Sequence, residues 1–428
     1  MELEVLAEKY ALAPETVGFM RQYGYDEAEK DYHWRRKELE CDALTERWKF
    51  LRLPGSADAA EKALCKAERS EHFRHLFNYL YFYWYKYEKA LIYNHKLPDM
   101  SKCPGDEEQS GLLELLMAVA GSYAVERKFD DMGLERSYAE CALQRISEDT
   151  VFHSSRAGRL LYPADGHHWM RFFVEGKLFR IGRFEYMTLP ETIQFAPHIF
   201  RHKESGKVIA LCRDDWKFDC GGWRLWRDYP DEKPYFTAFL QETDEFICGT
   251  PVDPAGFAEV DRTVTLRKDE FEPLWRDGDL VPDIHIPPGG NMRMELCRSS
   301  LEDAVSFFEK YFHCTPKAFT CFSWILNPDL GGLLPDSNMA RFMREVYLTP
   351  FSGSSLSGLY FVFGKEDKDW SNYPAENSVQ RAFHTLRKEN KRLKTGGMFI
   401  DRRGIEQFGQ GLYRREYGEI SEKLCKKI

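Results

Sequence analysis

The sequence predicts an α+β protein, with an all-helical N-terminal part followed by a mixed, mostly antiparallel sheet and flanking helices. Apolar residues recur at helical spacing through residues 1–155. After that point, short runs alternate between apolar and polar residues, as strands do. One stretch, residues 282–312, combines a strand, a glycine-containing loop and a helix. We therefore expect two domains, residues 1–155 and residues 156–428.

The N-terminal part contains several candidate helices with recognisable ends. Pro14 suits the first turn of a helix, Ser56 or Asp58 suits an N-cap, and Gly133 suits a break. The expected helical segments are residues 2–12, 14–23, 26–49, 56 onward, 71–95, 112–120, 126–132 and 134–146, with a loop at 97–111. The segment 71–95 is so aromatic that we expect it to pack in a core, or else to line a cleft.

The second part is expected to be built mainly from antiparallel strands. We expect a hairpin around Glu175 and Gly176, a strand pair around residues 203–206, and a structured loop at 214–229. Further strands are expected within residues 234–257, 259–275, 317–326, 346–351 and 359–364, with helices at 338–344, capped by Asp336 or Ser337, and at 376–394. This order places a short parallel pair at the middle of the sheet.

The stretch 282–312 has the residues of an anion-binding turn. A strand at 283–286 ends at Pro287, because proline donates no ladder hydrogen bond. Gly289 and Gly290 let a ligand approach the main chain, and Ser299 and Ser300 suit the N-cap of a helix that runs to residue 312. Free N–H groups at a helix start can hold a pyrophosphate. An ordinary strand–helix unit without a ligand has the same pattern.

Composition excludes some classes of function. The chain has 428 residues, of which 43% are hydrophobic and 30% charged, and its net charge is -9. This charge argues against wholesale binding of nucleic acid or of an anionic membrane. There is no apolar run long enough for a transmembrane helix, and the acidic, amphipathic N-terminus does not resemble a signal peptide. We expect a cytoplasmic protein.

Cysteine and histidine spacing gives no metal signature. The 11 cysteines include no C-x-x-C pair and are interpreted as reduced, mostly structural thiols. His198 and His202 are four residues apart, and His167 is followed by His168, but no cysteine or carboxylate completes a zinc spacing. We expect no metal site.

The second part also resembles a known family. Its order of elements is similar to the GNAT acyltransferase fold, in which a central strand, a turn and a helix N-terminus hold the pyrophosphate of acetyl- or acyl-coenzyme A. The resemblance is carried, in order, by GKLFRIGRFEYM (176–187), GTPVDPAGFAEVDRTVTL (249–266), DIHIPPGG (283–290), SSLEDAVSFFEKYF (299–312) and FTCFSWILNPDLGGLLPDSN (319–338). With these segments the sequence resembles the bacterial acyltransferase domain-containing proteins. Those proteins have a helical N-acyltransferase N-terminal domain and a GNAT-like C-terminal domain.

The resemblance implies acyl transfer from acetyl-CoA or acyl-CoA to the amine of a small acceptor. His285 is the candidate base, and Asp283 lies two residues away on the same face of the strand, where it would orient the ring. Main-chain N–H groups after Ile286 would polarise the thioester carbonyl. The alternative is that His285 is a satisfied core histidine and Asp283 a cap at the strand's edge.

Further candidate residues follow the central strand. The resemblance implies that the coenzyme contacts Gly289, Gly290, Ser299 and Ser300. Asn338 begins the next helix, where GNAT enzymes often contact the pantetheine or pyrophosphate arm, although it also suits a cap.

Cys321 and Ser323 share one face of the strand that follows. Either side chain could protonate the leaving thiolate or contact substrate, and burial in a core explains both equally well.

Two readings of function remain open. One is a coenzyme-A-dependent N-acyltransferase, with the helical part shaping the acceptor pocket. The other is a non-catalytic binding module for an acyl-CoA, a sugar or a protein partner, because the Q/R-x-x-G-x-G/A motif of GNAT enzymes is absent between strand and helix. Hydrolysis through Cys321 is a third, more distant reading. If the aromatic residues between Tyr79 and Tyr93 are exposed, a homodimer is plausible.

Overall fold

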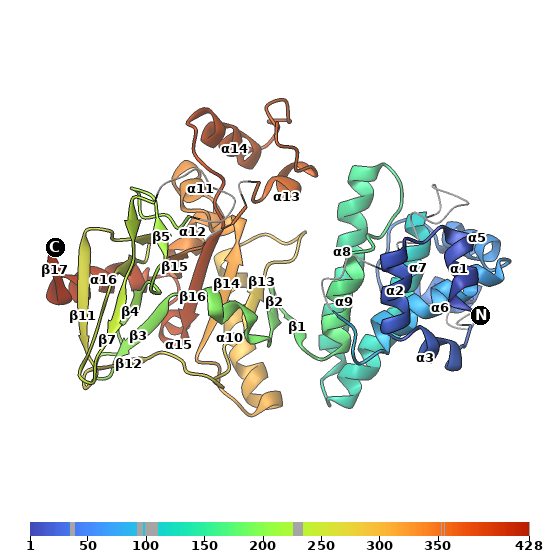
Figure 1. Cartoon of the computed structure of the whole chain (residues 1–428), viewed down its shortest axis with the longest axis horizontal. Coiled ribbons are helices and arrows are strands. Elements are labelled where there is room, and N and C mark those ends of the chain that lie inside the picture. The colour runs from blue at the N-terminus through green and yellow to red at the C-terminus, as the bar shows by residue number, and fades with distance from the viewer. Residues whose placement is uncertain are drawn as a thin grey trace. The chain divides into compact units, whose positions relative to one another are not determined.

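The computed structural model describes residues 1–34, 39–91, 97–98, 110–225, 234–351, 353–354 and 356–427 (Figure 1). Contacts between residues divide the chain into two compact units. The first comprises Met1–Arg180 together with Pro287–Gly290, and the second comprises Ile181–Ile286 and Asn291–Ile428. The division by contacts thus falls after residue 180, and the domain bounds expected at residues 155 and 156 stay a prediction.

The first unit is built from helices. They are α1 (Leu3–Tyr10), α2 (Pro14–Gln22), α3 (Tyr25–Lys30), α4 (Cys41–Phe50), α5 (Ala57–Ala67), α6 (Glu71–Tyr85), α7 (Ser110–Asp131), α8 (Arg136–Ala157) and α9 (Gly166–Val174). Three predicted ends are confirmed: Pro14 lies in the first turn of α2, Ser56 caps α5, and Gly133 separates α7 from α8 at a φ of 69°. The predicted loop at 97–111 lies mostly outside the described residues.

The aromatic helix α6 is a core element. Tyr79, Tyr81 and Tyr83 are each 0% exposed, so the prediction of core packing is confirmed. The homodimer was inferred from exposed aromatic residues. For these residues the expected exposure is wrong, because α1, α3, α7 and α9 of the same unit cover α6. Tyr93 lies outside the described residues, and the oligomeric state itself stays untested.

A polar chain of three side chains is buried among these helices. The Tyr85 hydroxyl lies 2.7 Å from Nδ1 of His167, and Nε2 of His167 lies 2.9 Å from Oε2 of Glu114. None of the three residues is more than 3% exposed. The chain therefore joins α6, α7 and α9 by hydrogen bonds that water does not reach, and such bonds are costly to break.

The hairpin expected around Glu175 and Gly176 is wrong. Residues up to Val174 form α9, and Gly176, at a φ of 66°, follows its C-terminal end, where the Lys177 N–H donates to the Phe172 carbonyl at 3.0 Å. α9 is buried on almost every side, and Arg171 interrupts its apolar residues, so the segment resembles the alternation of a strand. The strand pair begins later, with β1 (Leu178–Ile181) and β2 (Phe184–Met187).

The second unit contains the sheets. A six-stranded sheet has the order β1-β2-β13-β14-β16-β15, where β13 is Asp283–His285, β14 Ala318–Ser323, β15 Tyr347–Pro350 and β16 Gly396–Asp401. A five-stranded sheet has the order β10-β9-β4-β3-β12, which are Phe257–Ala258, Pro251–Asp253, Val208–Leu211, His198–His202 and Phe271–Pro273. A four-stranded sheet has the order β17-β11-β8-β7, which are Cys425–Lys427, Arg262–Arg267, Phe246–Gly249 and Leu240–Glu242. β5 (Lys217–Phe218) pairs with β6 (Phe236–Thr237).

Helices and 3₁₀ turns cover and connect these sheets. They are η3 (Pro190–Phe195), α10 (Met294–Phe312), η4 (Trp324–Leu326), α11 (Pro328–Leu333), α12 (Asn338–Glu345), α13 (Leu359–Phe363), α14 (Ser378–Lys388), α15 (Arg402–Glu406) and α16 (Leu412–Leu424). The segment 359–364, expected as a strand, is the short helix α13, held between Gly358 and Gly364 at φ values of 87° and 76°. No described helix has the length and apolar character needed to cross a membrane.

The six-stranded sheet is the mixed, mostly antiparallel sheet that was expected. β13 and β14 are parallel and adjacent, as predicted, and the other strand pairs given with a register are antiparallel. β16 was not predicted, although it lies between β14 and β15 and is buried along its whole length.

The two faces of this sheet pack differently. On one face, Tyr186 of β2 and Phe319 of β14 contact Phe308 of α10, at centroid distances of 6.5 and 6.4 Å. On the other face, Tyr347 stacks on Phe399 at 4.8 Å and donates its hydroxyl to a main-chain carbonyl of β9. We call these the α10 face and the β9 face.

Ser300 fixes α10 against the sheet, and its removal tests that link. Its buried hydroxyl donates to the Ile181 carbonyl and accepts the Phe184 N–H. Ser300→Ala leaves both main-chain groups without this partner, so we expect the free energy of unfolding to fall by about 1–3 kcal/mol in denaturant titrations. Ser306→Ala, on the exposed side of the same helix, is the control and should change it by less than about 0.5 kcal/mol.

The buried chain of the helical unit gives a second stability prediction. His167→Leu removes the nitrogen that pairs with Glu114 and leaves that carboxylate in an apolar surrounding. We expect a loss of about 3–5 kcal/mol, read from the denaturant midpoint of the full chain. His72→Leu on α6, which is only half-buried, should cost less than about 0.5 kcal/mol. Equal losses of unfolding free energy in the two variants would contradict a stabilising role for the Tyr85–His167–Glu114 hydrogen bonds.

Candidate functional site

The parallel strands β13 and β14 are joined at one end only. Main-chain bonds run from Lys317 N to Leu280 O at 2.9 Å and from Thr320 N to Pro282 O at 3.0 Å. In the described structure their ladder contains the single register pair Asp283–Thr320, whereas β14 pairs with β16 over six residues. The strands therefore separate toward their carboxyl ends, and His285 lies on the separated part of β13.

His285 and Asp283 lie together, as the sequence predicted. They are two residues apart on β13 and point to the same face, with Nε2 of His285 3.8 Å from Oδ2 of Asp283. Oδ1 of Asp283 accepts a hydrogen bond of 2.8 Å from the Thr320 hydroxyl. Asp283 is 2% exposed, but 28% of the His285 side chain remains accessible. A fixed carboxylate thus faces the ring of an accessible imidazole.

Glu185 is a candidate that sequence reasoning missed. It is 0% exposed and lies on β2 directly opposite His285 in the antiparallel register. Directly paired residues share a face, so two buried carboxylates, Glu185 and Asp283, flank the imidazole. The sequence signal was a glutamate between Phe184 and Tyr186, at a strand position where a charged side chain is rarely buried without a role.

Cys321 and Ser323 lie on the opposite face of the sheet from His285. Thr320 shares the face of Asp283 by register, so Cys321 and Ser323 point to the α10 face. Cys321 is 1% exposed, and burial, followed by the charge of Asp283, raises the pKa of its thiol well above the usual value. Ser323 caps η4 by accepting the Ile325 N–H at 3.3 Å. The structure therefore does not bring these two residues to the His285 side.

The helix after the central strand begins earlier than expected. α10 starts at Met294 with Arg293 as N-cap, so Ser299 and Ser300 lie inside the helix and the predicted cap is wrong. Ser299 bonds Asp303 on the exposed side at 3.2 Å, and Ser300 is buried against β2. The sequence signal was misleading because serines followed by acidic residues suit a cap but also suit the middle of an amphipathic helix.

The actual start of α10 carries basic side chains. Oδ1 of Asn291 accepts the Arg293 N–H at 3.1 Å, and Nε of Arg183 donates to the Asn291 carbonyl at 3.0 Å. The first-turn N–H groups from Met294 on have no acceptor within the helix. The Arg183 guanidinium thus lies at the N-terminus of this 19-residue helix, where Arg293 is the N-cap residue and Glu295 the one acidic residue of the first turn. Main-chain N–H groups beside a guanidinium suit an anion.

Ile286 follows β13 and is the last residue of the segment Ile181–Ile286, which belongs to the second unit. Gly289 and Gly290 belong to the first unit. Gly289 has a φ of 83°, and a Cβ built on it would lie 3.8 Å from Oε1 of Glu148 on α8. Glu148 is itself held by Arg180 through two bonds of 2.6 and 2.8 Å. The glycine turn therefore lies beside the carboxylate of an Arg180–Glu148 ion pair.

Two remaining expectations concern Asn338 and the histidines. Asn338 is half-buried at the first position of α12. Ser337, one of the two expected caps, is the N-cap and accepts the Ala340 N–H at 3.1 Å. His198 and His202 lie at the two ends of strand β3 instead of on a helix. In the described residues no three histidine, cysteine, aspartate or glutamate side chains gather as a metal site would need.

Solved structures with the same fold are acyltransferases by description. One, described as an acyltransferase in complex with decanoyl-CoA and teicoplanin, has a TM-score of 0.58 at 16% identity over 94% of this chain and 99% of that one. A second, with CoA and 10C-teicoplanin, gives the same values. A mutant acyltransferase in complex with octanoyl-CoA has a TM-score of 0.59 at 15% identity and the same coverage. Identity this low establishes the fold alone.

Among curated proteins, none matches the chain significantly. The family model of the GNAT-like C-terminal domain matches residues 178–404, which is more than half of the chain and includes every strand of the six-stranded sheet. The chain therefore belongs to the GNAT-like C-terminal domain family.

Proposed function

We propose that the protein is an acyl-CoA-dependent N-acyltransferase that acts on a small amine, such as an amino sugar. The observation that carries this proposal is the parallel pair β13–β14, joined at Asp283 and separated at His285, with an accessible imidazole on its face. The family fold supports it. So do the solved relatives, which are described with CoA, octanoyl-CoA and decanoyl-CoA.

In this proposal the coenzyme's pyrophosphate binds at the start of α10. Arg183, Arg293 and the first-turn N–H groups supply the donors. This replaces the expected contacts at Ser299 and Ser300, which lie further along the helix, and at Gly289 and Gly290, which lie beside Glu148. The acyl thioester would then reach the carboxyl end of β13, where a main-chain N–H after His285 polarises its carbonyl.

The chemistry is direct attack of the acceptor amine on the thioester carbon. A C–N bond forms, the C–S bond breaks, and the coenzyme leaves as a thiolate that takes up a proton. Nε2 of His285 is buried and faces Asp283, so Nδ1, the other nitrogen of this 28% accessible side chain, is the one proposed to take the amine's proton. Asp283 and Glu185 then stabilise the imidazolium by their charge.

A non-catalytic module that binds acyl-CoA, a sugar or a protein is the second candidate. It is favoured by one specific observation, the absence of Q/R-x-x-G-x-G/A between β13 and α10. The two candidates differ in turnover, whereas both allow coenzyme binding. Binding and catalysis are therefore tested separately.

Coenzyme binding is tested with Arg293→Glu, which places a negative charge at the N-cap of α10. We expect calorimetric titration with CoA and decanoyl-CoA to show at least tenfold weaker binding than wild type, about 1.4 kcal/mol. Arg298→Glu is the matched control, because Arg298 is exposed one turn further along and pairs with Glu302 at 2.8 Å. If wild-type protein binds no CoA species, both candidate functions that use acyl-CoA are wrong.

Catalysis is tested with His285→Gln. With acyl-CoA and a panel of small amines and amino sugars, we expect kcat to fall about 10²–10⁴-fold while the Kd for acyl-CoA changes less than threefold. The exposed His313, at the end of α10, provides the control His313→Gln. Unchanged thiol release in His285→Gln would exclude the proposed base, and no turnover in wild type with any acceptor would favour the binding module.

Hydrolysis through Cys321 would require a reactive thiol, whereas the burial of Cys321 predicts an unreactive one. Burial raises the pKa of Cys321, so native protein should react with thiol reagents at the exposed Cys220 and Cys314 first. We expect mass spectrometry to find Cys321 unmodified until denaturant is added, and Cys321→Ala to retain any thioester-cleaving activity. Loss of that activity in a folded Cys321→Ala variant would restore the hydrolase reading.

A further inference from the structure

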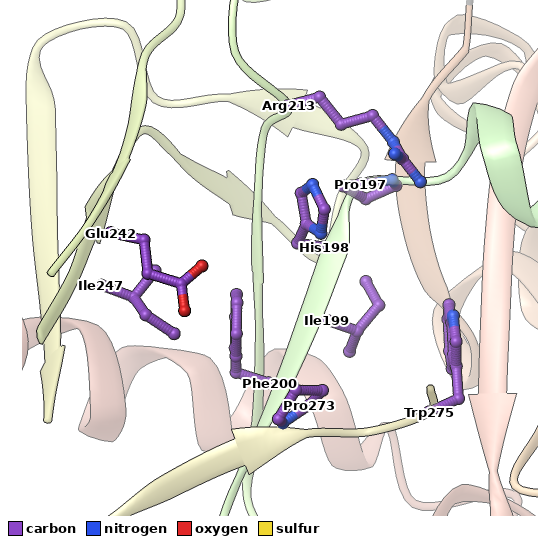
Figure 2. A pocket seen from close by; sticks show the side chains of 9 residues that line it. All are labelled: Pro197, His198, Ile199, Phe200, Arg213, Glu242, Ile247, Pro273 and Trp275. Carbon is purple, nitrogen blue, oxygen red and sulfur yellow. The ribbon is translucent and has the colours of Figure 1, made fainter. Parts of the chain in front are cut away.

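A polar cavity lies away from β13, between the five-stranded and four-stranded sheets. Its volume is about 160 Å³, and it is lined by β3 on one side and by residues of β7 and β8 on the other (Figure 2). Figure 2 shows the imidazole of His198 between Glu242 and the guanidinium of Arg213, with Trp275 beyond Ile199. None of these residues belongs to the acyl-transfer site proposed above.

Arg213 is a cation without a carboxylate in the described part of the chain. Its Nε donates to the Ala196 carbonyl at 2.7 Å and its Nη2 to the Ile193 carbonyl at 3.0 Å. These bonds fix the guanidinium but do not neutralise it, and Nη1 has no partner among the described residues. Burial lowers the pKa of Arg213, which is the sign of a charge held partly out of water.

A second arginine adds to the positive field. Burial, and less strongly the charge of Arg213, lower the pKa of Arg224 to about 10. Its Nη1 is buried and makes no hydrogen bond in the described structure. The carboxylate on the far side, Glu242, is exposed and paired with Lys268 at 2.6 Å, so its charge is offset. An anion in the cavity would offset the unbalanced charge on the Arg213 side.

Neutral donors complete the cavity. The ring nitrogens of His198 bond no described residue, and the same holds for the indole N–H of Trp275. Burial, followed by the charge of Arg213, lowers the pKa of His198, so the ring is neutral at pH 7 and offers one N–H. Ile247 and Pro273 supply an apolar wall on the His198 side, whereas Ile199, the next residue of β3, points to the opposite face.

We propose that this cavity is a binding site for a small aliphatic carboxylate of the acetate-to-butyrate size. The free edge of the Arg213 guanidinium takes the carboxylate, His198 donates to its oxygen, and the short chain lies against Ile247 and Pro273. The volume of about 160 Å³ is well below the roughly 300–1,000 Å³ of pockets for drug-sized ligands and matches a short-chain acid. The site is independent of the proposed acyl transfer.

The test compares butyrate with butyramide, which has the same shape without the charge, in calorimetry and saturation-transfer NMR on the full chain. We expect saturable binding of butyrate and at least tenfold weaker binding of the amide. Equal affinities would overturn the proposal, and so would binding of inorganic phosphate without binding of any carboxylate. No saturable binding of acetate, propionate or butyrate at 50 mM would also overturn it.

Variants locate the site. Arg213→Gln should abolish butyrate binding, whereas Arg201→Gln, an exposed arginine of β3 paired with Glu272 at 2.6 Å, should leave it unchanged. Because Arg213 also bonds two main-chain carbonyls, its loss can impair folding. His198→Phe keeps those bonds, and we expect it to weaken butyrate binding at least threefold, whereas Arg201→Gln should bind butyrate as wild type does. Equal butyrate affinity in wild type and both cavity variants would overturn the assignment.

Discussion

The second unit depends on the link between Asp283 and Thr320. Their strands are parallel, and their one register pair is reinforced by a side-chain hydrogen bond of 2.8 Å. Because the bond lies at the end of the shared ladder, it holds the strands together where they meet and leaves them free to separate beyond. The same bond fixes the carboxylate beside His285. A single interaction thus determines both the opening in the sheet and the orientation of the group proposed to act there.

Much of the fold could be predicted from local signals, and the errors share one cause. Ser56 and Ser337 were each one of two predicted cap candidates, because a cap is a local property of the chain. β16 was not predicted, and it begins with two glycines, Gly396 and Gly397, a residue type depleted in strands. A Cβ on Gly396 would lie 2.1 Å from the Leu326 carbonyl oxygen, and one on Gly397 would lie 2.5 Å from the Thr349 hydroxyl. These glycines are required by close packing between distant segments, which the local sequence does not show.

The candidate site follows the same distinction. His285 and Asp283 were placed together correctly, since alternation within one strand is fixed by geometry. Glu185 was missed, and Cys321 was not separated from His285, since both require the register between strands. The shift of the helix start from Ser299 to Met294 moves the proposed anion site from serines to Arg183 and Arg293. Basic donors are therefore present at the start of α10 although the Q/R-x-x-G-x-G/A motif is absent from the sequence.

The position of β16 has a consequence for synthesis of the protein. β14 and β15 are joined through β16, yet β16 is made some 70 residues after β14. Until residues 396–401 leave the ribosome, β14 has an open edge toward β16 and β15 has no partner in this sheet. Unpaired edges of apolar strands favour aggregation of nascent chains. Chaperones that cover such edges until β16 is made should therefore raise the yield of correctly folded protein.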